Sequence, residues 1–208
     1  MRFHHIIWDF DGTLFDTYPE TARSMQTALH NHGYEYSYQE IYDLMKVSMS
    51  TMARYFRETV GVGDEVFRDY DAIRRQNEVD ECPPYDGISE LLRDIVAAGG
   101  KNYLCTHRDE SAFKIMKAYG VYGLFEGFAT AMDKLPPKPN PDSVTYLMDK
   151  FGFSAGDAVM IGDREIDVRA GKGAGLKTIS FWDGTGQRLT SADFDTESVS
   201  AIRDVLGL

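Results

Sequence analysis

Two patterns alternate along residues 85–181, and this alternation constrains the fold more than any other feature of the sequence. Short apolar runs predict buried strands, whereas longer segments with apolar residues at positions i, i+3 and i+4 predict amphipathic helices. Strands that alternate with helices form right-handed βαβ units, so we expect an α/β fold with a Rossmann-like parallel sheet. The expected strands are Asn102–Thr106, a short strand within residues 123–130, Ala158–Ile161 and Leu176–Phe181, and the expected helices are residues 88–96, Asp109–Tyr119, Pro141–Phe151 and Ile166–Ala174.

One further strand and a long helical insert precede this region. The apolar run Phe3–Phe10 ends in carboxylates, and such a run is typical of a buried parallel strand. Helical spacing then continues to the sequence Cys82-Pro83-Pro84, whose prolines mark a linker. We expect residues 1–15 and 85–208 to form the α/β core, and residues 16–84 to form an inserted α-helical domain.

The expected helical domain contains two capping boxes and an apolar stripe. Thr17 with Glu20, and Ser37 with Glu40, have the spacing at which a hydroxyl and a carboxylate cap the start of a helix. Apolar residues at helical spacing usually form the core of such a domain. Those expected in this core are Met49, Met52, Tyr55 and Phe56.

Composition excludes several classes of partner. The net charge of −11 opposes binding to a nucleic-acid backbone or to an anionic membrane. The N-terminal apolar run breaks at Asp9, well short of the roughly 7–15 apolar residues of a secretory signal or the roughly 20 of a membrane span. Cys82 and Cys105 have neither a metal-ligand spacing nor a disulfide framework, so we expect reduced thiols and a cytoplasmic protein. Either a monomer or a dimer is compatible with the sequence.

Asp9 and Asp11 predict a cation site at the end of the first strand. Residues i and i+2 of a strand point the same way, so both carboxylates can address one site. Two close carboxylates repel each other unless a cation lies nearby, and Mg²⁺ suits carboxylate, water and phosphate oxygens. Gly12 permits a tight turn that leaves backbone N–H groups available to an anion.

Polar residues also follow the other expected strands, where ligands bind in open α/β sheets. Thr106 can donate a hydrogen bond to a phosphate oxygen, and Lys138, fixed between prolines, can neutralise phosphate charge. Asp163 can complete a metal site with Asp9. Asp167 lies one helical turn later, where it can face the same space or orient Lys138.

The order and spacing of these motifs resemble those of the haloacid dehalogenase superfamily across the whole α/β core. The motifs are DxDGT at residues 9–13, Thr106, Lys138 and GDxxxD at residues 162–167. The position of the helical insert and the sequence Lys138-Pro139-Asn140-Pro141 are similar to the subfamily that contains phosphoglycolate phosphatase and β-phosphoglucomutase. This resemblance implies that residues 16–84 form a helical cap domain.

The resemblance also implies a set of chemical roles. Asp9 would be the nucleophile that becomes an aspartyl phosphate, and Asp11 the general acid and later the general base. Mg²⁺ would be held by the Asp9 carboxylate, the Asp11 backbone carbonyl and Asp163. The implied activity is a Mg²⁺-dependent phosphatase of a small phosphorylated metabolite, without nucleic-acid or membrane partners.

The remaining implied roles concern the substrate. Thr106 and Lys138 would bind the transferring phosphoryl group, with Gly12 and His107 contributing at the same place. Asp167 would support Lys138 and the metal site without contacting the substrate itself. Lys46 lies where the substrate-specificity loop of the cap is expected.

Two alternative functions stay open. A β-phosphoglucomutase-like sugar-phosphate mutase carries an arginine in the cap loop for its second phosphate, and none occurs between Arg23 and Arg54. A non-catalytic, phosphate-binding regulatory protein on the same fold is disfavoured because every expected acid and base is present. Fold alone does not choose among these functions.

Overall fold

The computed structural model describes residues 1–185 and 188–208, and the chain divides into two compact units. We name the first the α/β unit, which comprises Met1–Phe15 and Pro84–Leu208, and the second the helical unit, which comprises Asp16–Pro83. Pro84, expected at the end of the helical insert, belongs to the α/β unit, where it forms an isolated β-bridge with Phe15.

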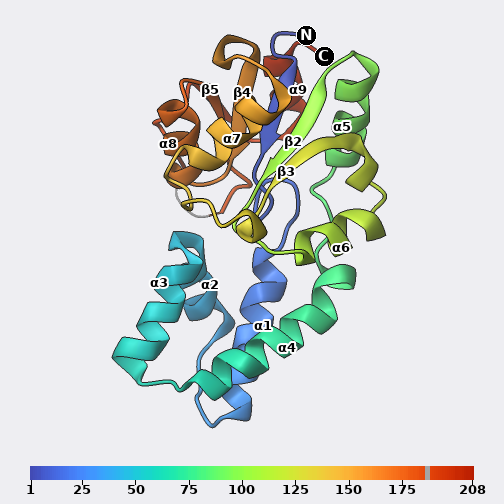
Figure 1. The fold of residues 1–208 in the computed structure, drawn as a ribbon. Helices are drawn as coiled ribbons and strands as arrows, with labels where there is room; N and C mark the ends of the chain where they lie inside the picture. The colour runs from blue at the N-terminus through green and yellow to red at the C-terminus, as the bar shows by residue number, and fades with distance from the viewer. Residues whose placement is uncertain (186–187) are drawn as a thin grey trace. The chain divides into compact units, whose positions relative to one another are not determined.

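Six strands of the described residues form one parallel sheet in the order β3-β2-β1-β4-β5-β6 (Figure 1). They are β1 (His5–Trp8), β2 (Lys101–Cys105), β3 (Phe125–Ala129), β4 (Ala158–Gly162), β5 (Lys177–Phe181) and β6 (Phe194–Thr196). Because β1 lies between β2 and β4, the carboxyl ends of these three strands meet at the middle of one sheet edge. The α/β Rossmann-like fold expected from the sequence is confirmed.

Helices cover both faces of this sheet (Figure 1). Helices α7 (Asp142–Phe151) and α8 (Glu165–Gly173) pack on one face, whereas α5 (Ile88–Ala97) and α9 (Val199–Leu206) lie on the other. Helix α6 (Ser111–Ala118) follows β2. The sheet is therefore buried on both sides, as its nearly continuous apolar strands require.

A buried polar contact ties the central strands to α5. Trp8 Nε1 on β1 donates to Asn102 Oδ1 on β2 over 3.0 Å, and Asn102 Nδ2 donates to the Leu92 carbonyl over 3.3 Å. Trp8 and Asn102 are both fully buried. Each polar group thus finds a partner inside the core, which fixes the lateral position of β1 and of the residues that follow it.

The helical unit packs around its own apolar core. Its helices are α1 (Tyr18–Asn31), α2 (Tyr38–Val47), α3 (Met49–Arg54) with a π-helical continuation Tyr55–Val60, and α4 (Asp64–Glu81). Met52 and Phe56 are buried in this core, and Met49 and Tyr55 pack against it, as the apolar stripe predicts.

Only the second of the two expected capping boxes forms. The Glu40 N–H donates to Ser37 Oγ and the Ser37 N–H donates to Glu40 Oε2, which confirms the prediction there. The prediction at Thr17 and Glu20 is wrong, because the Thr17 side chain makes no cap bond. Glu20 is instead buried, and its carboxylate accepts a 2.7 Å hydrogen bond from Ser24.

Strand β6 and helix α9 were not expected from the sequence. The three residues of β6, Phe194–Thr196, include a central Asp, so they lack the apolar run that marks a buried strand. In the described part of the chain, every helix is too short or too polar to cross a membrane.

Candidate active site

The turn after β1 fixes the first two acidic residues. Asp9 is 1% exposed, and its N–H donates to the Ile161 carbonyl of β4 over 2.9 Å. The chain then turns through Gly12, whose φ of 75° lies in the left-handed region that favours glycine. The carboxylate of Asp9 is therefore anchored in the sheet, while Asp11 sits on the turn with a quarter of its side chain exposed.

Lys138 lies at the centre of the buried charges. It comes from the loop between β3 and α7, and its side chain is 1% exposed. The Lys138 ammonium lies 2.7 Å from Asp9 Oδ1 and 2.7 Å from Asp167 Oδ1, and it donates to the Cys105 carbonyl over 2.9 Å. The sequence-based expectation that Asp167 orients Lys138 agrees with this geometry.

These contacts shift the pKa values of all three groups. Burial alone would raise the pKa of Asp9, but the Lys138 ammonium and the Arg164 guanidinium outweigh it and hold this pKa below its ordinary value. Burial and the Asp9 charge raise the pKa of Asp167. Burial opposes the charge on Lys138, yet the Asp167 and Asp9 carboxylates raise its pKa. Asp9 is thus an ionised carboxylate inside the protein.

Asp167 is placed by a glycine. It lies in the first turn of α8, where its Oδ2 accepts the Arg164 N–H over 3.1 Å. A Cβ added at Gly162 would lie 2.3 Å from the Asp167 Cβ, closer than any real contact. The absence of a side chain at residue 162 therefore makes room for the buried carboxylate that faces Lys138.

Three carboxylates form a possible metal-binding cluster. Oxygen atoms of Asp9, Asp163 and Asp167 all lie within 4.8 Å of one another. Hard oxygen donors of this kind suit a divalent cation such as Mg²⁺, so the residues present fit the expected ion. These carboxylates also have other partners: Thr13 Oγ1 donates to Asp163 over 3.4 Å, and Arg164 lies 3.4 Å from Asp9.

The Asp11 carboxylate does not belong to this cluster. Its two oxygens lie 2.8 and 3.1 Å from Nε of Arg108. The expected contribution of Asp11 to a metal was its backbone carbonyl, and the side-chain geometry is compatible with that division of roles. The Asp11 carboxylate is held separately from those of Asp9, Asp163 and Asp167.

The segment after β2 brings Thr106, His107 and Arg108 to the same sheet edge. Thr106 is 5% exposed, and its Oγ1 accepts the Arg108 N–H over 3.1 Å. Desolvation of the ring and the nearby Lys138 ammonium lower the pKa of His107 to about 4, so His107 is neutral at neutral pH. The site thereby offers a hydroxyl and a neutral imidazole next to the buried charges.

Two arginines at the site were not among the expected site residues. Arg108 and Arg164 each contact an expected catalytic acid, Asp11 and Asp9 respectively. Both sit next to motif residues in the sequence, directly after His107 and Asp163, and that adjacency was the available signal. A charged residue in such a loop is also typical of an exposed surface, so sequence alone did not assign them.

Lys46 belongs to the helical unit, where its ammonium lies 4.4 Å from the centre of the Tyr18 ring. This cation–π contact anchors the end of α2 to α1. The expected contact of Lys46 with substrate stays a prediction.

Comparisons with known proteins place the chain among relatives of similar length. It is 26% identical to the pyrophosphatase PpaX of Bacillus velezensis, with 98% of this chain and 96% of the relative covered. It is also 26% identical to the phosphoglycolate phosphatase of Vibrio parahaemolyticus, over the same shares of the two chains.

Solved structures share the fold over nearly the full length. A predicted phosphoglycolate phosphatase from Haemophilus somnus superposes with a TM-score of 0.86 at 21% identity, covering 99% of both chains, which bears on fold alone. A hydrolase from Streptococcus pneumoniae is 28% identical and covers all of both chains with a TM-score of 0.70. The family model for haloacid dehalogenase-like hydrolases matches residues 6–181. With the motif acids brought together at one sheet edge, the chain belongs to the haloacid dehalogenase-like hydrolase family.

Proposed function

We propose that this protein is a Mg²⁺-dependent phosphatase that hydrolyses a small phosphorylated metabolite through an aspartyl-phosphate intermediate. The observation that carries the proposal is the buried, ionised Asp9, which lies 2.7 Å from Lys138 at the sheet edge where ligands bind. Phosphoryl transfer depends mainly on positioning and on neutralisation of charge, and the residues around Asp9 supply both.

The proposed reaction has two displacements at phosphorus. In the first, an Asp9 carboxylate oxygen forms a bond to phosphorus, the bond from phosphorus to the leaving oxygen breaks, and Asp11 gives that oxygen a proton. In the second, water attacks the same phosphorus and gives a proton to Asp11, and the bond between phosphorus and Asp9 breaks. Inorganic phosphate leaves, and both carboxyl groups return to their starting states.

Positive charge and hydrogen-bond donors would hold the phosphoryl group during both steps. Lys138 already has a carbonyl and two carboxylates around its ammonium, so it stays charged and fixed. We propose that Lys138 and the Thr106 hydroxyl bind phosphoryl oxygens, with His107 beside them. The Gly12 N–H, which the sequence placed at the same site, instead donates to the Phe15 carbonyl over 2.9 Å. Because Asp167 fixes Lys138, it acts on the reaction indirectly.

The acidic cluster supports the proposed metal. Asp9, Asp163 and the Asp11 backbone carbonyl would hold Mg²⁺, with Asp167 close to them. When bound, the ion would offset repulsion between the anionic nucleophile and the anionic phosphate. The net charge of −11 makes such local compensation necessary for an anionic substrate.

The names of two relatives support a choice of substrates to test. Two relatives aligned over nearly the whole chain are named pyrophosphatase and phosphoglycolate phosphatase, so pyrophosphate and small phosphomonoesters head the list of substrates to test. We further propose that the helical unit is a cap that selects among them, with Lys46 as one of its substrate contacts.

Phosphate release from a metabolite panel, with and without Mg²⁺, tests the proposed function. Wild-type protein should release inorganic phosphate in Mg²⁺, and Asp9→Asn should lower turnover by at least about 1,000-fold, because no other group replaces the nucleophile. Asp149→Asn, an exposed change on α7, is the matched control and should keep wild-type turnover. Undiminished turnover by Asp9→Asn would contradict the proposal.

The same panel separates the alternatives. A sugar-phosphate mutase would consume a hexose 1-phosphate without releasing inorganic phosphate. A regulatory protein would bind phosphate compounds and turn over none of them.

A further inference from the structure

We propose that Arg108 is a positioning residue that holds the Asp11 carboxylate in place for proton transfer to the leaving group. The inference rests on the proposed function, in which Asp11 is the general acid. It assigns a role to a residue outside the four motifs that the sequence singled out.

The contact between the two side chains constrains orientation. Arg108 Nε lies 2.8 Å from Asp11 Oδ1 and 3.1 Å from Asp11 Oδ2, so the donor is shared between both oxygens. A donor shared by both oxygens restrains where the carboxylate group lies and the direction in which it points. Charge-assisted contacts of this kind are also the stronger class of hydrogen bond.

Arg108 is itself held on several sides. Its side chain is 8% exposed, its Nη1 donates to Ser111 Oγ over 3.4 Å, and its guanidinium carbon lies 5.1 Å from the centre of the Phe10 ring. Its carbonyl accepts the Ala131 N–H over 2.9 Å. An arginine with so little freedom can impose its position on a partner at small entropic cost.

Asp11 is the residue that needs such a partner. It lies on the turn next to Gly12, with 25% of its side chain exposed, whereas Asp9 is 1% exposed and anchored in the sheet. The two acids also have different cationic neighbours, Lys138 and Arg164 for Asp9, and Arg108 for Asp11. The nucleophile is thus fixed by burial, and the proton-transfer group by a separate arginine.

The position of Arg108 in the chain couples this orientation to the phosphate site. Its own N–H donates to the hydroxyl oxygen of Thr106, the residue proposed to bind the phosphoryl group. The Thr106 N–H in turn donates to the Ala129 carbonyl at the end of β3. The acid and the phosphoryl ligand are therefore set relative to one another by one short segment, as preorganised proton transfer requires.

The dependence of the rate on the leaving group tests this role. A good leaving group departs without a proton, whereas a poor one needs the general acid. We compare kcat/KM for 4-nitrophenyl, phenyl and propyl phosphate, which cover leaving groups from good to poor. Arg108→Gln should lower kcat/KM for propyl phosphate by about ten-fold more than for 4-nitrophenyl phosphate, and Arg108→Lys should restore part of the difference.

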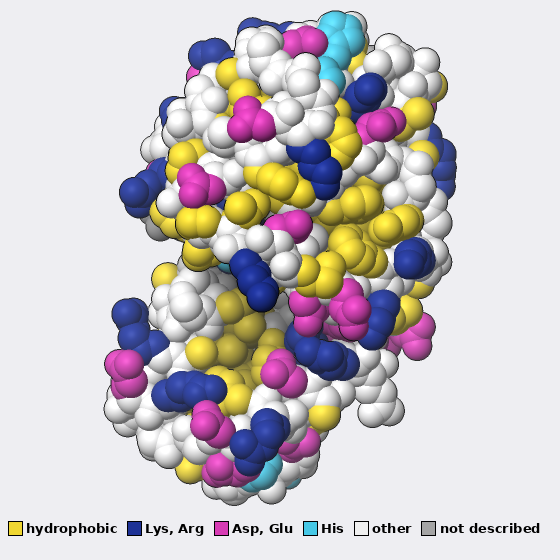
Figure 2. Space-filling model, in the orientation of Figure 1, with side chains coloured by type: hydrophobic (Ala, Val, Ile, Leu, Met, Phe, Trp, Pro, Cys, Tyr) yellow, Lys and Arg dark blue, Asp and Glu magenta, His cyan; other side chains and the backbone are white. Residues whose placement is uncertain are grey.

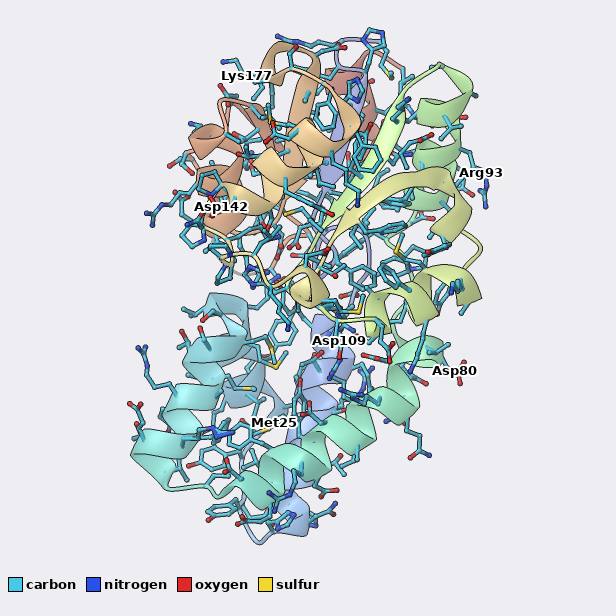
Figure 3. The ribbon with its side chains drawn as sticks, viewed as in Figure 1. Met25, Asp80, Arg93, Asp109, Asp142 and Lys177 are labelled. Atoms are coloured by element: carbon cyan, nitrogen blue, oxygen red, sulfur yellow. The ribbon has the colours of Figure 1, made fainter. Side chains whose placement is uncertain are left out.

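A double-mutant cycle shows whether Arg108 acts through Asp11. Asp11→Asn alone should show the same selective loss for poor leaving groups, and adding Arg108→Gln should then add no further selectivity. Arg93→Gln is the control for removing an arginine. Arg93 lies on α5, away from the loop at Asp109 (Figure 3), and its side chain is 54% exposed. This control should match wild type.

Two further readouts exclude a folding effect or a role in substrate binding. The thermal midpoint identifies a variant that is poorly folded, and inhibition by inorganic phosphate should be unchanged in Arg108→Gln, since Thr106 and Lys138 remain. An equal loss of kcat/KM for all three substrates in a folded Arg108→Gln, or weaker phosphate inhibition, would overturn the inference. If Asp11→Asn itself shows no selectivity, the proposed role of Asp11 fails instead.

Discussion

At the scale of single residues, the site depends on Gly162 as much as on the charged groups around it, because a glycine has no Cβ. Asp167 occupies the space that a Cβ at residue 162 would fill. The Asp167 carboxylate then lies 2.7 Å from the Lys138 ammonium. The position of the cation that faces Asp9 therefore depends on a residue with no functional group.

We predict that Gly162→Ala displaces Asp167 and destabilises the protein by about 1–3 kcal/mol, the usual cost of overpacking. Turnover should fall as well, because Lys138 loses a fixed partner. Gly156→Ala is the control, since a Cβ there meets no atom within 4 Å, and it should change stability by less than about 0.5 kcal/mol. Urea unfolding and phosphatase assays measure both effects, and equal behaviour of the two variants would contradict the prediction.

Cys105 gives a second prediction at this scale. Burial raises the pKa of its thiol to about 12, so it is protonated at pH 8, where an ordinary cysteine is partly ionised. Iodoacetamide at pH 8 should therefore alkylate the Cys105 peptide at least about ten-fold more slowly in the native protein than in urea. Peptide mass spectrometry measures this, and comparable rates in the two conditions would show that the thiol is accessible and ionised.

At the scale of elements, the site is a property of strand ends rather than of any one segment. Residues that follow β1, β2 and β4, with the loop after β3, converge because these strands are neighbours in one parallel sheet. This convergence brings the carboxylates of Asp9, Asp163 and Asp167 together. Their mutual repulsion is relieved by Lys138 and would be relieved further by a divalent ion.

We expect Mg²⁺ to raise the thermal midpoint of the wild-type protein, because an ion that binds only the folded state stabilises it by about 2.7 kcal/mol at 100 times its Kd. Asp163→Asn removes one ligand and should abolish most of this shift. Scanning calorimetry with and without Mg²⁺ measures it independently of turnover. A shift of the same size in Asp163→Asn would exclude Asp163 as a ligand.

His5 on β1 yields a pH prediction. Desolvation lowers the pKa of His5, whose ring stacks on Phe153 at 4.3 Å, and this effect exceeds the opposing influence of Asp157. His5 therefore takes up a proton more readily in the unfolded chain than in the folded one. The contribution of neutral His5 to stability is present above about pH 6.5 and is lost as the pH falls below it. His5→Phe should lose less stability than wild type between pH 7.5 and pH 5 in urea titrations. Identical pH dependence of the two proteins would contradict this assignment.

The elements also show what sequence could predict. Apolar runs in the sequence predict β1, β2, β4 and β5, because strands buried on both faces require such runs. Strand β6 was missed since Phe194–Thr196 is short and half polar, although the spacing of Val199, Ile202 and Leu206 was a usable signal for α9.

The site was predictable to the extent that its motifs are linear. The sequence placed Asp167 one helical turn after Asp163 and offered the pairing with Lys138 as one of two roles for it. The pairings of Arg108 with Asp11 and of Arg164 with Asp9 depend on which loops meet in space, and no spacing along the chain encodes that. The same limit explains the wrong capping prediction at Thr17, because Glu20 turns inward to partners that include Asn77, far along the chain.

At the scale of the whole molecule, the net charge of −11 opposes the approach of the anionic substrate proposed above. On the face drawn in Figure 2, Lys and Arg side chains lie interspersed with Asp and Glu on each unit. Attraction for phosphate therefore has to come from the site itself, from Lys138, the Thr106 hydroxyl and the proposed ion. The proposed mechanism thus depends on Asp9 being the group that forms the bond to phosphorus.

Trapping the intermediate tests that claim most directly. Wild-type protein is mixed with a substrate radiolabelled at phosphorus, quenched in acid within a turnover, digested and mapped. The proposed mechanism predicts label on the peptide that contains Asp9, released by hydroxylamine as an acyl phosphate must be, and no label in Asp9→Asn. Label on another residue, or full turnover by Asp9→Asn, would contradict it.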